Sequence, residues 1–313
     1  MTTLLDVARK AGVSKSTVSN VVRGASIVAD TTRRRVERAI RETGYHPNMI
    51  ARALKARTSH AIAIVVPDLT NPFFGELVVS AERAASAMNY GLVAANTECL
   101  ASLEMEAGRS LIARHIDGVI IAGMSRASRL PQMLLDRDIP VVLSSFGGVE
   151  DNRLGVVDHD DELAMESIVG HLCDLGHRRM AFVSPKLREH SGERRRTAFR
   201  TALKRRGLKA ATREDVATAF IAHDDILALA TIDRLERAGR RVPRDVSVVG
   251  YDDIPLAGHH RIGLTTVHSD AGLMGNRAVE LLVDAARQAR HVASRIVQPN
   301  PLIIRTTTAE ARS

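Results

Sequence analysis

The sequence predicts an α/β protein in which a small all-α domain precedes a larger region of parallel sheets flanked by helices. The charge distribution is the first reason. Residues 1–60 hold 12 Lys and Arg against 4 Asp and Glu, whereas residues 61–313 hold 32 of each, so the net charge of +8 lies in the first fifth of the chain. The second reason is the hydrophobic pattern, which has a helical period up to Gly44 and from Ala61 alternates between β-branched runs and amphipathic stretches. At 313 residues, the chain is also longer than one compact domain usually is.

The composition excludes several classes of protein. With 45% hydrophobic and 26% charged residues, the chain has the composition of a soluble globular protein. No apolar stretch approaches the roughly 20 residues of a membrane helix, and the N-terminus lacks the layout of a signal peptide. Cys99 and Cys173 form neither a disulfide framework nor a zinc pattern. We expect a cytoplasmic protein with reduced cysteines, no membrane association and no cofactor.

The first 44 residues predict helix, turn, helix and a third helix. Apolar residues of segment 4–11 share one helical face, Gly12 ends that helix, and Ser14 suits the N-cap of the next. A third helix begins in the cap region 30–32 and ends near Gly44. Together with the basic charge, this pattern is typical of a helix-turn-helix domain, in which the second helix enters the major groove of DNA. The residues expected to face inward are Leu4, Val7, Ala8, Ala11, Val18, Val21, Val22, Val36, Ala39 and Ile40.

The region after residue 60 predicts two lobes of parallel sheet covered by helices on both faces. Ligands of such open sheets bind beyond the carboxyl ends of the strands. Helices are expected over stretches such as 73–90, 161–176, 194–206 and 270–290. The expected strands are Ala61–Pro67, Gly91–Asn96, Gly118–Ile121, Val141–Ser144, Met180–Ser184, Ala219–Ala222 and Val246–Gly250.

A set of short motifs runs through the first 54 residues. They are Asp6-Val7-Ala8, Ala11-Gly12-Val13-Ser14, Thr17-Val18-Ser19, Thr32-Arg33, Gly44-Tyr45, Pro47-Asn48 and Ala51-Arg52-Ala53-Leu54. Together they resemble the N-terminal signature of the LacI (lactose-repressor) family of bacterial transcription regulators. The resemblance implies that Lys15, Ser16 and Asn20 of the second helix face base edges. Many relatives have Arg at the position of Asn20, whereas Asn favours adenine. Residues implied to contact phosphates are Ser14, Thr17 and Ser19.

The segment 48–57 is a short, basic helix candidate that would be marginal alone in water. In the family, the equivalent hinge helix folds on operator DNA, and the residue matching Leu54 wedges into the minor groove. A plain linker helix with a core leucine is the alternative. On this basis residues 1–57 form the DNA-binding domain, 58–60 a linker and 61–313 the effector-binding and dimerisation domain. The hinge residues expected to contact DNA are Asn48, Arg52, Leu54 and Lys55.

The region from Ala61 resembles the family's periplasmic-binding-protein-like effector domain, whose two lobes are joined by three crossovers. We expect these crossovers near 145–155, 265–269 and 297–301. Arg195 matches an arginine that in the family binds oxygen atoms of the effector. Its guanidinium can donate two parallel hydrogen bonds, which suits a carboxylate or a sugar diol. Each candidate has a structural alternative: Phe73 in the core, Arg195 on a solvated helix, and Asp252 as a helix cap. The candidate effector contacts are Phe73, Ser145, Arg195, Asp224 and Asp252.

The second of the two expected lobes, the carboxyl lobe, departs from the family pattern in length. Only 28 residues separate Arg195 from Asp224, considerably fewer than in most relatives, as though one strand and part of a helix were absent near 207–218. This lobe has either a smaller sheet or an altered response to ligand.

The expected function is that of a dimeric transcriptional regulator, a repressor that binds near-palindromic operator DNA and responds to a small-molecule effector. The alternatives are an effector-independent regulator with a degenerate ligand domain, or a solute-binding or sugar-processing protein. No catalytic motif supports an enzyme, and His159-Asp160-Asp161-Glu162 and His223-Asp224-Asp225 are better explained as helix starts than as metal sites.

Overall fold

The computed structural model describes residues 2–22, 25, 27–45, 58–144, 151–184, 190–288, 290–292 and 294–312. It divides into two compact units, Met1–Ser59 and His60–Ser313. We describe each unit by itself. In the described part of the chain, no helix is long and apolar enough to cross a membrane.

The first unit contains the predicted helix-turn-helix arrangement. Thr3 and Asp6 form a capping box at the start of the first helix, and Gly12 ends that helix in the left-handed conformation with φ 62°. Gly44 ends the third helix in the same way. The third helix begins one residue after Ala29, which makes no side-chain cap bond, so Asp30 lies in the first turn rather than at the cap. The helices are α1 (Leu4–Ala11), α2 (Lys15–Val22) and α3 (Asp30–Thr43).

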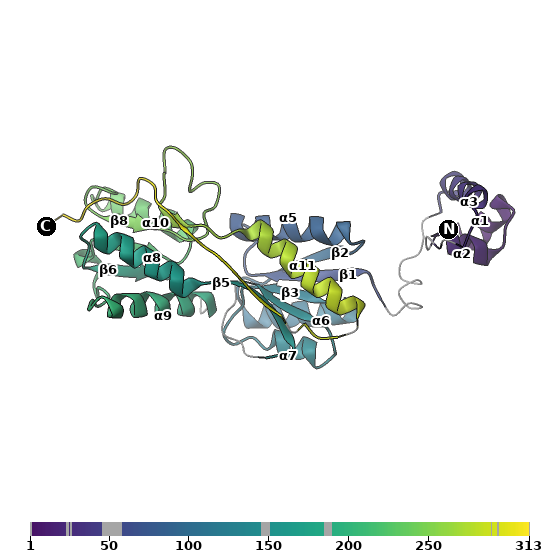
Figure 1. Ribbon diagram of the computed structural model, residues 1–313, viewed down its shortest axis with the longest axis horizontal. Coiled ribbons are helices and arrows are strands. Elements are labelled where there is room, and N and C mark those ends of the chain that lie inside the picture. The colour runs from purple at the N-terminus through teal and green to yellow at the C-terminus, as the bar shows by residue number, and fades with distance from the viewer. Residues whose placement is uncertain are drawn as a thin grey trace. The chain divides into compact units, whose positions relative to one another are not determined.

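The amino lobe of the second unit is built on a parallel sheet that has six strands in the described part of the chain, in the order β10-β5-β4-β3-β1-β2 (Figure 1). We call it the larger sheet. Its strands are β1 (Ala61–Val66), β2 (Gly91–Asn96), β3 (Val119–Ala122), β4 (Val141–Ser144), β5 (Leu154–His159) and β10 (Arg295–Gln298).

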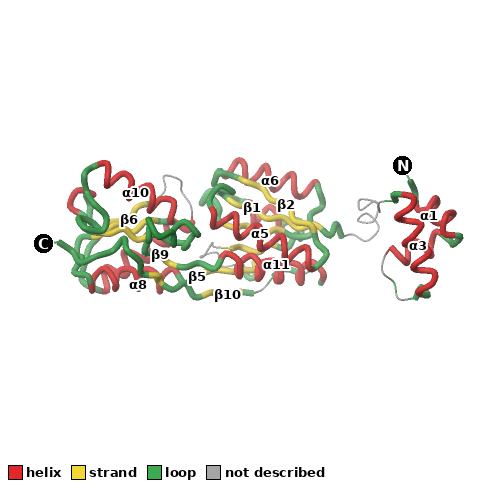
Figure 2. Tube along the Cα trace, turned by 90° about the horizontal axis from the view of Figure 1, so that it is seen from above, coloured by secondary structure: helices red, strands yellow, loops and turns green. Residues whose placement is uncertain are grey.

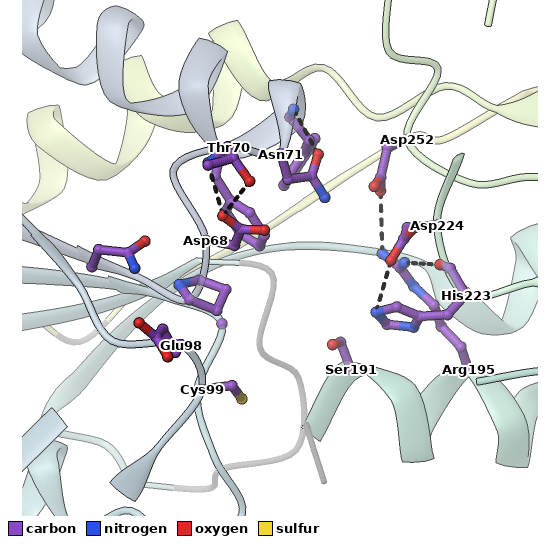
Figure 3. Close-up of a pocket in the computed structure, with 15 residues that line it drawn as sticks. Asp68, Thr70, Asn71, Glu98, Cys99, Ser191, Arg195, His223, Asp224 and Asp252 are labelled. Atoms are coloured by element: carbon purple, nitrogen blue, oxygen red, sulfur yellow. Dashed lines mark hydrogen bonds and ion pairs between the residues drawn. The ribbon is translucent and has the colours of Figure 1, made fainter. Parts of the chain in front are cut away.

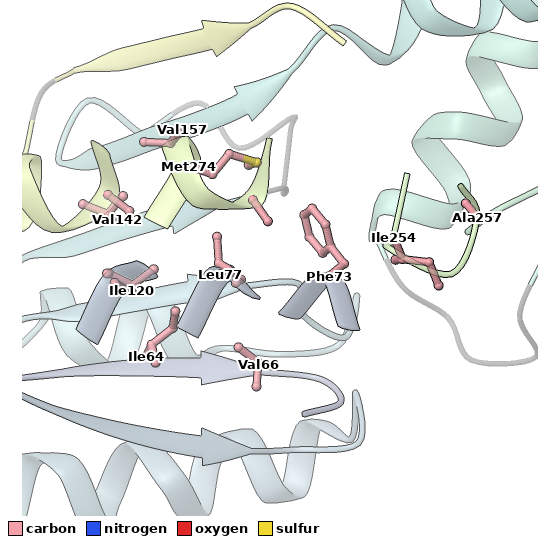
Figure 4. Packing of buried hydrophobic residues seen from close by; sticks show 14 of the residues in the cluster. Ile64, Val66, Phe73, Leu77, Ile120, Val142, Val157, Ile254, Ala257 and Met274 are labelled. Atoms are coloured by element: carbon pink, nitrogen blue, oxygen red, sulfur yellow. The ribbon is translucent and has the colours of Figure 1, made fainter. Parts of the chain in front are cut away.

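Alternate residues of the larger sheet face two different helical layers. On one face, Ile64 and Ile120 pack with Leu77 and Met274 from the helices α5 and α11, as Figure 4 shows. On the other face, Val65 and its neighbours pack with α6 and α7. Because strand side chains alternate between faces, this two-sided burial explains the nearly continuous apolar runs of these strands. The covering helices are α5 (Pro72–Ala87), α6 (Ala101–Ala113), α7 (Leu130–Leu135) and α11 (Ala271–Arg287).

The carboxyl lobe is built on a parallel sheet of three strands in the described chain, ordered β6-β7-β8, which we call the smaller sheet. Its helices lie on both faces, with α8 and α9 packed on one side and α10 on the other. An antiparallel pair, β9 and β11, lies beside it. The elements are β6 (Met180–Val183), β7 (Ala219–Ala222), β8 (Ser247–Val249), β9 (Thr266–Val267), β11 (Leu302–Ile303), α8 (Asp161–Asp174), α9 (His190–Arg205) and α10 (Asp225–Arg237).

Two of the three crossovers lie where the sequence predicted them. The chain passes from β9 to α11 between residues 267 and 271, and from β10 to β11 between residues 298 and 302 (Figure 2). The first prediction, 145–155, was wrong, because Leu154–His159 is a buried strand of the larger sheet and the chain leaves that sheet only after His159. The pairing of β5 with β4 and β10 is non-local, so the local pattern does not reveal it.

The connection that the sequence identified as short contains little regular structure. Between the end of α9 at Arg205 and the start of β7 at Ala219 the structure has one 3-10 turn, Glu214–Val216, and no strand among these described residues. Consequently β6 pairs with β7 on one side and forms the edge of the smaller sheet on the other.

Candidate functional site

The outer face of α2 is polar, and its inner face anchors the helix to the first unit. Val18 and Val21 are buried in the cluster that also contains Val7 and Val36. Lys15 and Ser16 are exposed at the start of the helix. The sequence of α2 contains no acidic residue, so no carboxylate on this helix would repel a phosphate.

Hydroxyl groups gather at the N-terminus of α2. The Thr17 amide donates to the Ser14 side chain at 3.1 Å, which makes Ser14 the cap that the sequence predicted. The same oxygen lies 2.7 Å from the Ser16 hydroxyl and 2.8 Å from that of Thr17. Amide and hydroxyl donors at the positive end of a helix are suited to a phosphate oxygen. Farther along the helix, Ser19 and Asn20 are half-buried.

Some of the expected site residues lie outside the described residues. They are Asn48, Arg52, Leu54 and Lys55 of the expected hinge helix 48–57, and Ser145 of the effector set.

A cavity of about 450 Å³ lies between the two lobes of the second unit, at the carboxyl ends of parallel strands from both sheets (Figure 3). The sequence predicted a ligand site at this position. The amino lobe contributes Pro67, Asp68, Thr70, Asn71, Phe73, Phe74, Asn96, Glu98, Cys99 and Gly123, and the carboxyl lobe contributes Ser191, Arg195, His223, Asp224 and Asp252.

The turn from β1 into α5 forms the wall on the amino-lobe side. Asn71 caps α5 by accepting from the Phe73 amide at 3.1 Å, with Pro72 in the first turn. Asp68 accepts from both the amide and the hydroxyl of Thr70, which fixes the turn in front of the helix. Phe73 is 5% exposed and packs edge to face with Phe74, so it is both a core residue and part of the cavity wall.

The loop after β2 contributes cavity residues that the sequence analysis missed. Glu98 and Cys99 are consecutive residues with positive φ, 51° and 55°. Residues other than glycine rarely adopt this backbone conformation, and those that do are concentrated at functional sites. Glu98 is exposed at the cavity rim, whereas Cys99 is buried in its wall. A backbone conformation of this kind has no signature in the hydrophobic pattern.

On the carboxyl-lobe side, Arg195 is buried and its guanidinium is held from several directions. It donates to the His223 carbonyl at 2.6 Å and lies 3.6 Å from the centre of the Tyr251 ring. It also pairs with Asp161 at 3.4 Å and with Asp252 at 3.7 Å. Burial alone would lower the pKa of Arg195, but the neighbouring acidic groups, Asp161 above all, outweigh burial and raise it.

Asp161 is the main counter-charge of this cluster. It accepts a hydrogen bond from the Tyr251 hydroxyl and pairs with Arg194 at 2.6 Å. Burial would raise the pKa of Asp161, but Arg195 and Arg194 outweigh it and lower the value to about 2. Arg194 also binds Asp158 of β5 through a second guanidinium nitrogen at 3.0 Å, so it joins the carboxyl lobe to the larger sheet. These partners lie far from Arg194 along the chain, so a local sequence pattern does not reveal them.

Asp224 and Asp252 line the cavity in different ways. Asp224 caps α10 by accepting from the Leu227 amide at 2.7 Å. Asp252 caps no helix, has φ 110° and is 6% exposed. Burial raises the pKa of Asp252 well above its ordinary value, although Arg195 opposes this. The structure therefore brings Phe73, Arg195, Asp224 and Asp252 together on one cavity.

The sequence matches three family models. Residues 3–48 match the bacterial regulatory proteins of the lacI family, and residues 59–219 match the periplasmic binding proteins and sugar binding domain of the LacI family. Residues 169–308 match a periplasmic binding protein-like domain.

Similar proteins cover nearly the whole chain. A protein from Vibrio vulnificus named HTH-type transcriptional repressor PurR is 30% identical over 334 residues, covering 98% of each chain. The protein of the same name from Photobacterium profundum is 31% identical over 338 residues, covering 99% of each. Both alignments are longer than the 313 residues of this chain, so each relative has residues that this chain lacks.

Two solved structures are also similar to nearly the whole chain. The lac repressor dimer bound to operator and the anti-inducer ONPF has a TM-score of 0.86 at 26% identity, covering 98% of this chain and 99% of that one. The transcriptional regulator CelR in complex with cellobiose has a TM-score of 0.73 at 30% identity, covering 98% of this chain and all of that one. The family, the fold and the type of regulator that the sequence predicted are therefore confirmed.

Proposed function

Because this chain belongs to the lacI family of bacterial regulatory proteins, we propose that it represses transcription as a homodimer on near-palindromic operator DNA and that a polar metabolite bound between its lobes controls its affinity for DNA. The PurR relatives and the lac repressor are named as repressors, and the lac repressor structure is bound to operator DNA. CelR is named as a transcriptional regulator and is complexed with cellobiose. An enzymatic role has no comparable support.

The observation that carries the proposal is the polar face of α2. Val18 and Val21 fix the helix to the core, which leaves Lys15 and Ser16 exposed at its N-terminus beside the hydroxyls of Ser14 and Thr17. In this proposal Lys15, Ser16 and Asn20 read base edges, whereas Ser14, Thr17 and Ser19 bind phosphate oxygens. The excess charge of residues 1–60 adds sequence-independent attraction to DNA.

The cavity between the lobes supports control by an effector. Its walls come from two sheets, so a ligand that binds both walls favours one relative position of the lobes. A ligand can shift such an equilibrium only by its difference in affinity for the two states. In a dimer, a change in lobe position would alter the spacing of the two DNA-binding units and thus the affinity for paired half-sites.

The test is selection of bound duplexes from a random DNA pool by the full-length protein, followed by titration of the selected duplex over a range of salt concentrations. We expect a palindromic site and a steep loss of affinity with salt, with a slope near −0.9 per phosphate neutralised. Asn20→Ala should relax base preference at one position of each half-site, at a cost of roughly 1–3 kcal/mol per bidentate pair. Arg237→Ala removes an exposed charge from α10 and is the control. It should leave the base preference and the salt dependence of binding unchanged. Salt-independent binding, or a pool without sequence enrichment, would contradict the proposal.

A further inference from the structure

The wall of the cavity between the lobes is acidic. Among the described residues that line it, Asp68 and Glu98 come from the amino lobe, and Asp224 and Asp252 come from the carboxyl lobe. Among the same described lining residues, Arg195 is the one lysine or arginine. Asp68 and Glu98 are exposed, whereas Asp252 is buried in the wall. A ligand in the cavity would therefore meet carboxylates on both sides.

Arg195 does not offset this acidity, because its charge is balanced within the protein. Asp161, which does not line the cavity, pairs with Arg195 at 3.4 Å and also with Arg194. Arg194 is in turn paired with the fully buried Asp158. The Arg195 nitrogen that donates to the His223 carbonyl at 2.6 Å is directed into the protein. An anionic ligand would have to compete with these acids for the guanidinium.

Asp252 provides a second and independent observation. Its side chain is 6% exposed and lines the cavity, yet it accepts no hydrogen bond from any residue that the structure describes. Its one charged partner there is Arg195, whose nearest nitrogen is 3.7 Å away and thus beyond hydrogen-bond distance. Asp252 therefore has acceptor positions on the cavity wall that no described residue fills, and a donor on a ligand or a water molecule can occupy them.

We infer that the cavity binds a small organic cation, an amine or amidine of roughly sugar size, whose charged nitrogen donates to Asp252 and whose remaining donors face Asp224, Asp68 and Glu98. This inference rests on the proposed function, since it names the chemical class of the effector. A cavity of about 450 Å³ is within the usual range for small-molecule sites.

The rest of the wall fits such a ligand. Phe73 and Phe74 provide an aromatic surface opposite the carboxyl lobe, against which a cation or the carbon frame of an amine can pack. Asp68 already accepts two hydrogen bonds from Thr70 and so remains oriented without the ligand. Carboxylate and phosphate ligands would be repelled from this surface, because like charges at short range oppose binding.

The experiment compares ligands that share a frame and differ in charge. Full-length protein is titrated in a thermal-shift assay and by calorimetry with glucosamine, glucose and glucuronate, and with matched linear amino alcohols, polyols and hydroxy acids. We expect amines to raise the melting temperature, polyols to raise it less and acids to have no effect, because a ligand that binds only the native state stabilises it.

Variants identify the carboxylates that are responsible. Asp252→Asn should weaken binding of the best amine by about tenfold or more, which corresponds to about 1.4 kcal/mol. Glu98→Gln at the exposed rim should have a smaller effect of the same sign, and it provides a test if Asp252→Asn folds poorly. Glu106→Gln is the control, because Glu106 is exposed on α6 and does not line the cavity.

Three results would overturn the inference: no amine binds, acids bind more tightly than amines, or amine binding is unchanged in both Asp252→Asn and Glu98→Gln. Binding to the selected DNA duplex is measured on the same preparation. A protein that binds this duplex but no amine refutes the cation inference alone, whereas a protein without sequence-specific DNA binding refutes the proposed function.

Discussion

The two lobes of the second unit form one cavity from unequal scaffolds. The amino lobe has the larger sheet covered by α5 and α11 on one face and by α6 and α7 on the other. The carboxyl lobe has the smaller sheet, whose connection before β7 is short. Nevertheless both lobes place cavity residues at the carboxyl ends of parallel strands, such as Asn96 at the end of β2 and His223 directly after β7. The comparison teaches that this kind of site depends on the ends of a few central strands and tolerates a narrower sheet around them.

The lobes also differ in how they hold their cavity walls. The wall of the amino lobe consists of a capped helix start and the aromatic pair Phe73 and Phe74. In contrast, the wall of the carboxyl lobe is attached to buried charges, with Arg195 held by Asp161 and the Tyr251 ring. Buried charges are stable only when they are paired, so the carboxyl lobe should be more sensitive to the loss of one side chain.

The largest effect expected from this difference is that of Arg195→Met, which keeps the apolar stem and removes the charge. Asp161 and Asp252 would then be buried with less compensation, and we expect the free energy of unfolding to fall by about 3–5 kcal/mol. Urea unfolding of the full chain measures this loss of unfolding free energy. A loss below about 1 kcal/mol would show that the charge cluster does not hold the lobe.

Two glycines allow a matched comparison of packing in the lobes. A Cβ on Gly250 would lie 2.1 Å from a carboxylate oxygen of the buried Asp225, whereas one on Gly275 would lie 2.7 Å from the Leu77 carbonyl of α5. Each Gly→Ala substitution should destabilise the protein by about 1–3 kcal/mol through overpacking. We expect Gly250→Ala to cost more, because Asp225 is also held by the Ile254 amide. Thermal unfolding of both variants compares them, and the reverse order would contradict the view that the carboxyl lobe is the more constrained.

Helix caps at the two walls give a smaller and more equal effect. Asn71 caps α5 and Asp224 caps α10, each through one amide hydrogen bond. Loss of either cap in Asn71→Ala or Asp224→Ala should cost about 1 kcal/mol of stability. Since Asp224 is also proposed to face the ligand, only Asp224→Ala should weaken amine binding strongly. Equal losses of amine affinity in the two variants would remove the special role of Asp224.

A separate prediction concerns the pH dependence of stability. Burial raises the pKa of Asp225 from its ordinary 3.8 to about 7, although the Thr266 hydroxyl opposes this. Between these values the native state binds more protons than the unfolded state, so this group makes the protein less stable as pH rises from about 4 to 7. Asp225→Asn should flatten that part of the profile in unfolding experiments, whatever its cost at a single pH. A slope identical to that of the unmodified protein would show that Asp225 does not titrate in this range.

His159 contributes with the opposite sign over part of this range. Burial lowers its pKa from 6.5 to about 4, so the unfolded state takes up the proton first as pH falls, and stability is lost from about pH 6.5 down to 4. For this reason the comparison of Asp225→Asn with the unmodified protein is made as a difference in slope.

Much of this architecture follows from local sequence patterns. The helices α1, α2 and α3 were predicted from apolar spacing within segments of 8–14 residues, together with the glycine stops Gly12 and Gly44 and the cap Ser14. The strands β1 to β4 and β6 to β8 were predicted because they are short apolar runs between helices. The strands β9 and β11 were missed, since each has only two residues and exists through pairing with the other.

The cavity could be predicted only in outline. Phe73, Arg195, Asp224 and Asp252 were assigned to one cleft by the resemblance to the family, and the structure places all four on the cavity. The acidic partner that balances the charge of Arg195 could not be found from the sequence, because the two meet only when α8 packs on α9. Tertiary pairing of charges leaves no periodic trace in a sequence.

The short connection before β7 has a further consequence, for solubility. Because β6 forms the edge of the smaller sheet, its outer backbone groups are available to strands of other molecules, and such edges can start aggregation. The Ala211 amide donates to the Met180 carbonyl at 2.8 Å and so blocks the first position of that edge. Exposed Arg178 and Arg179 precede β6, and exposed Lys209 lies in the connection. Positive charges of this kind discourage edge-to-edge association, so a protein whose sheet ends at β6 can still remain monodisperse.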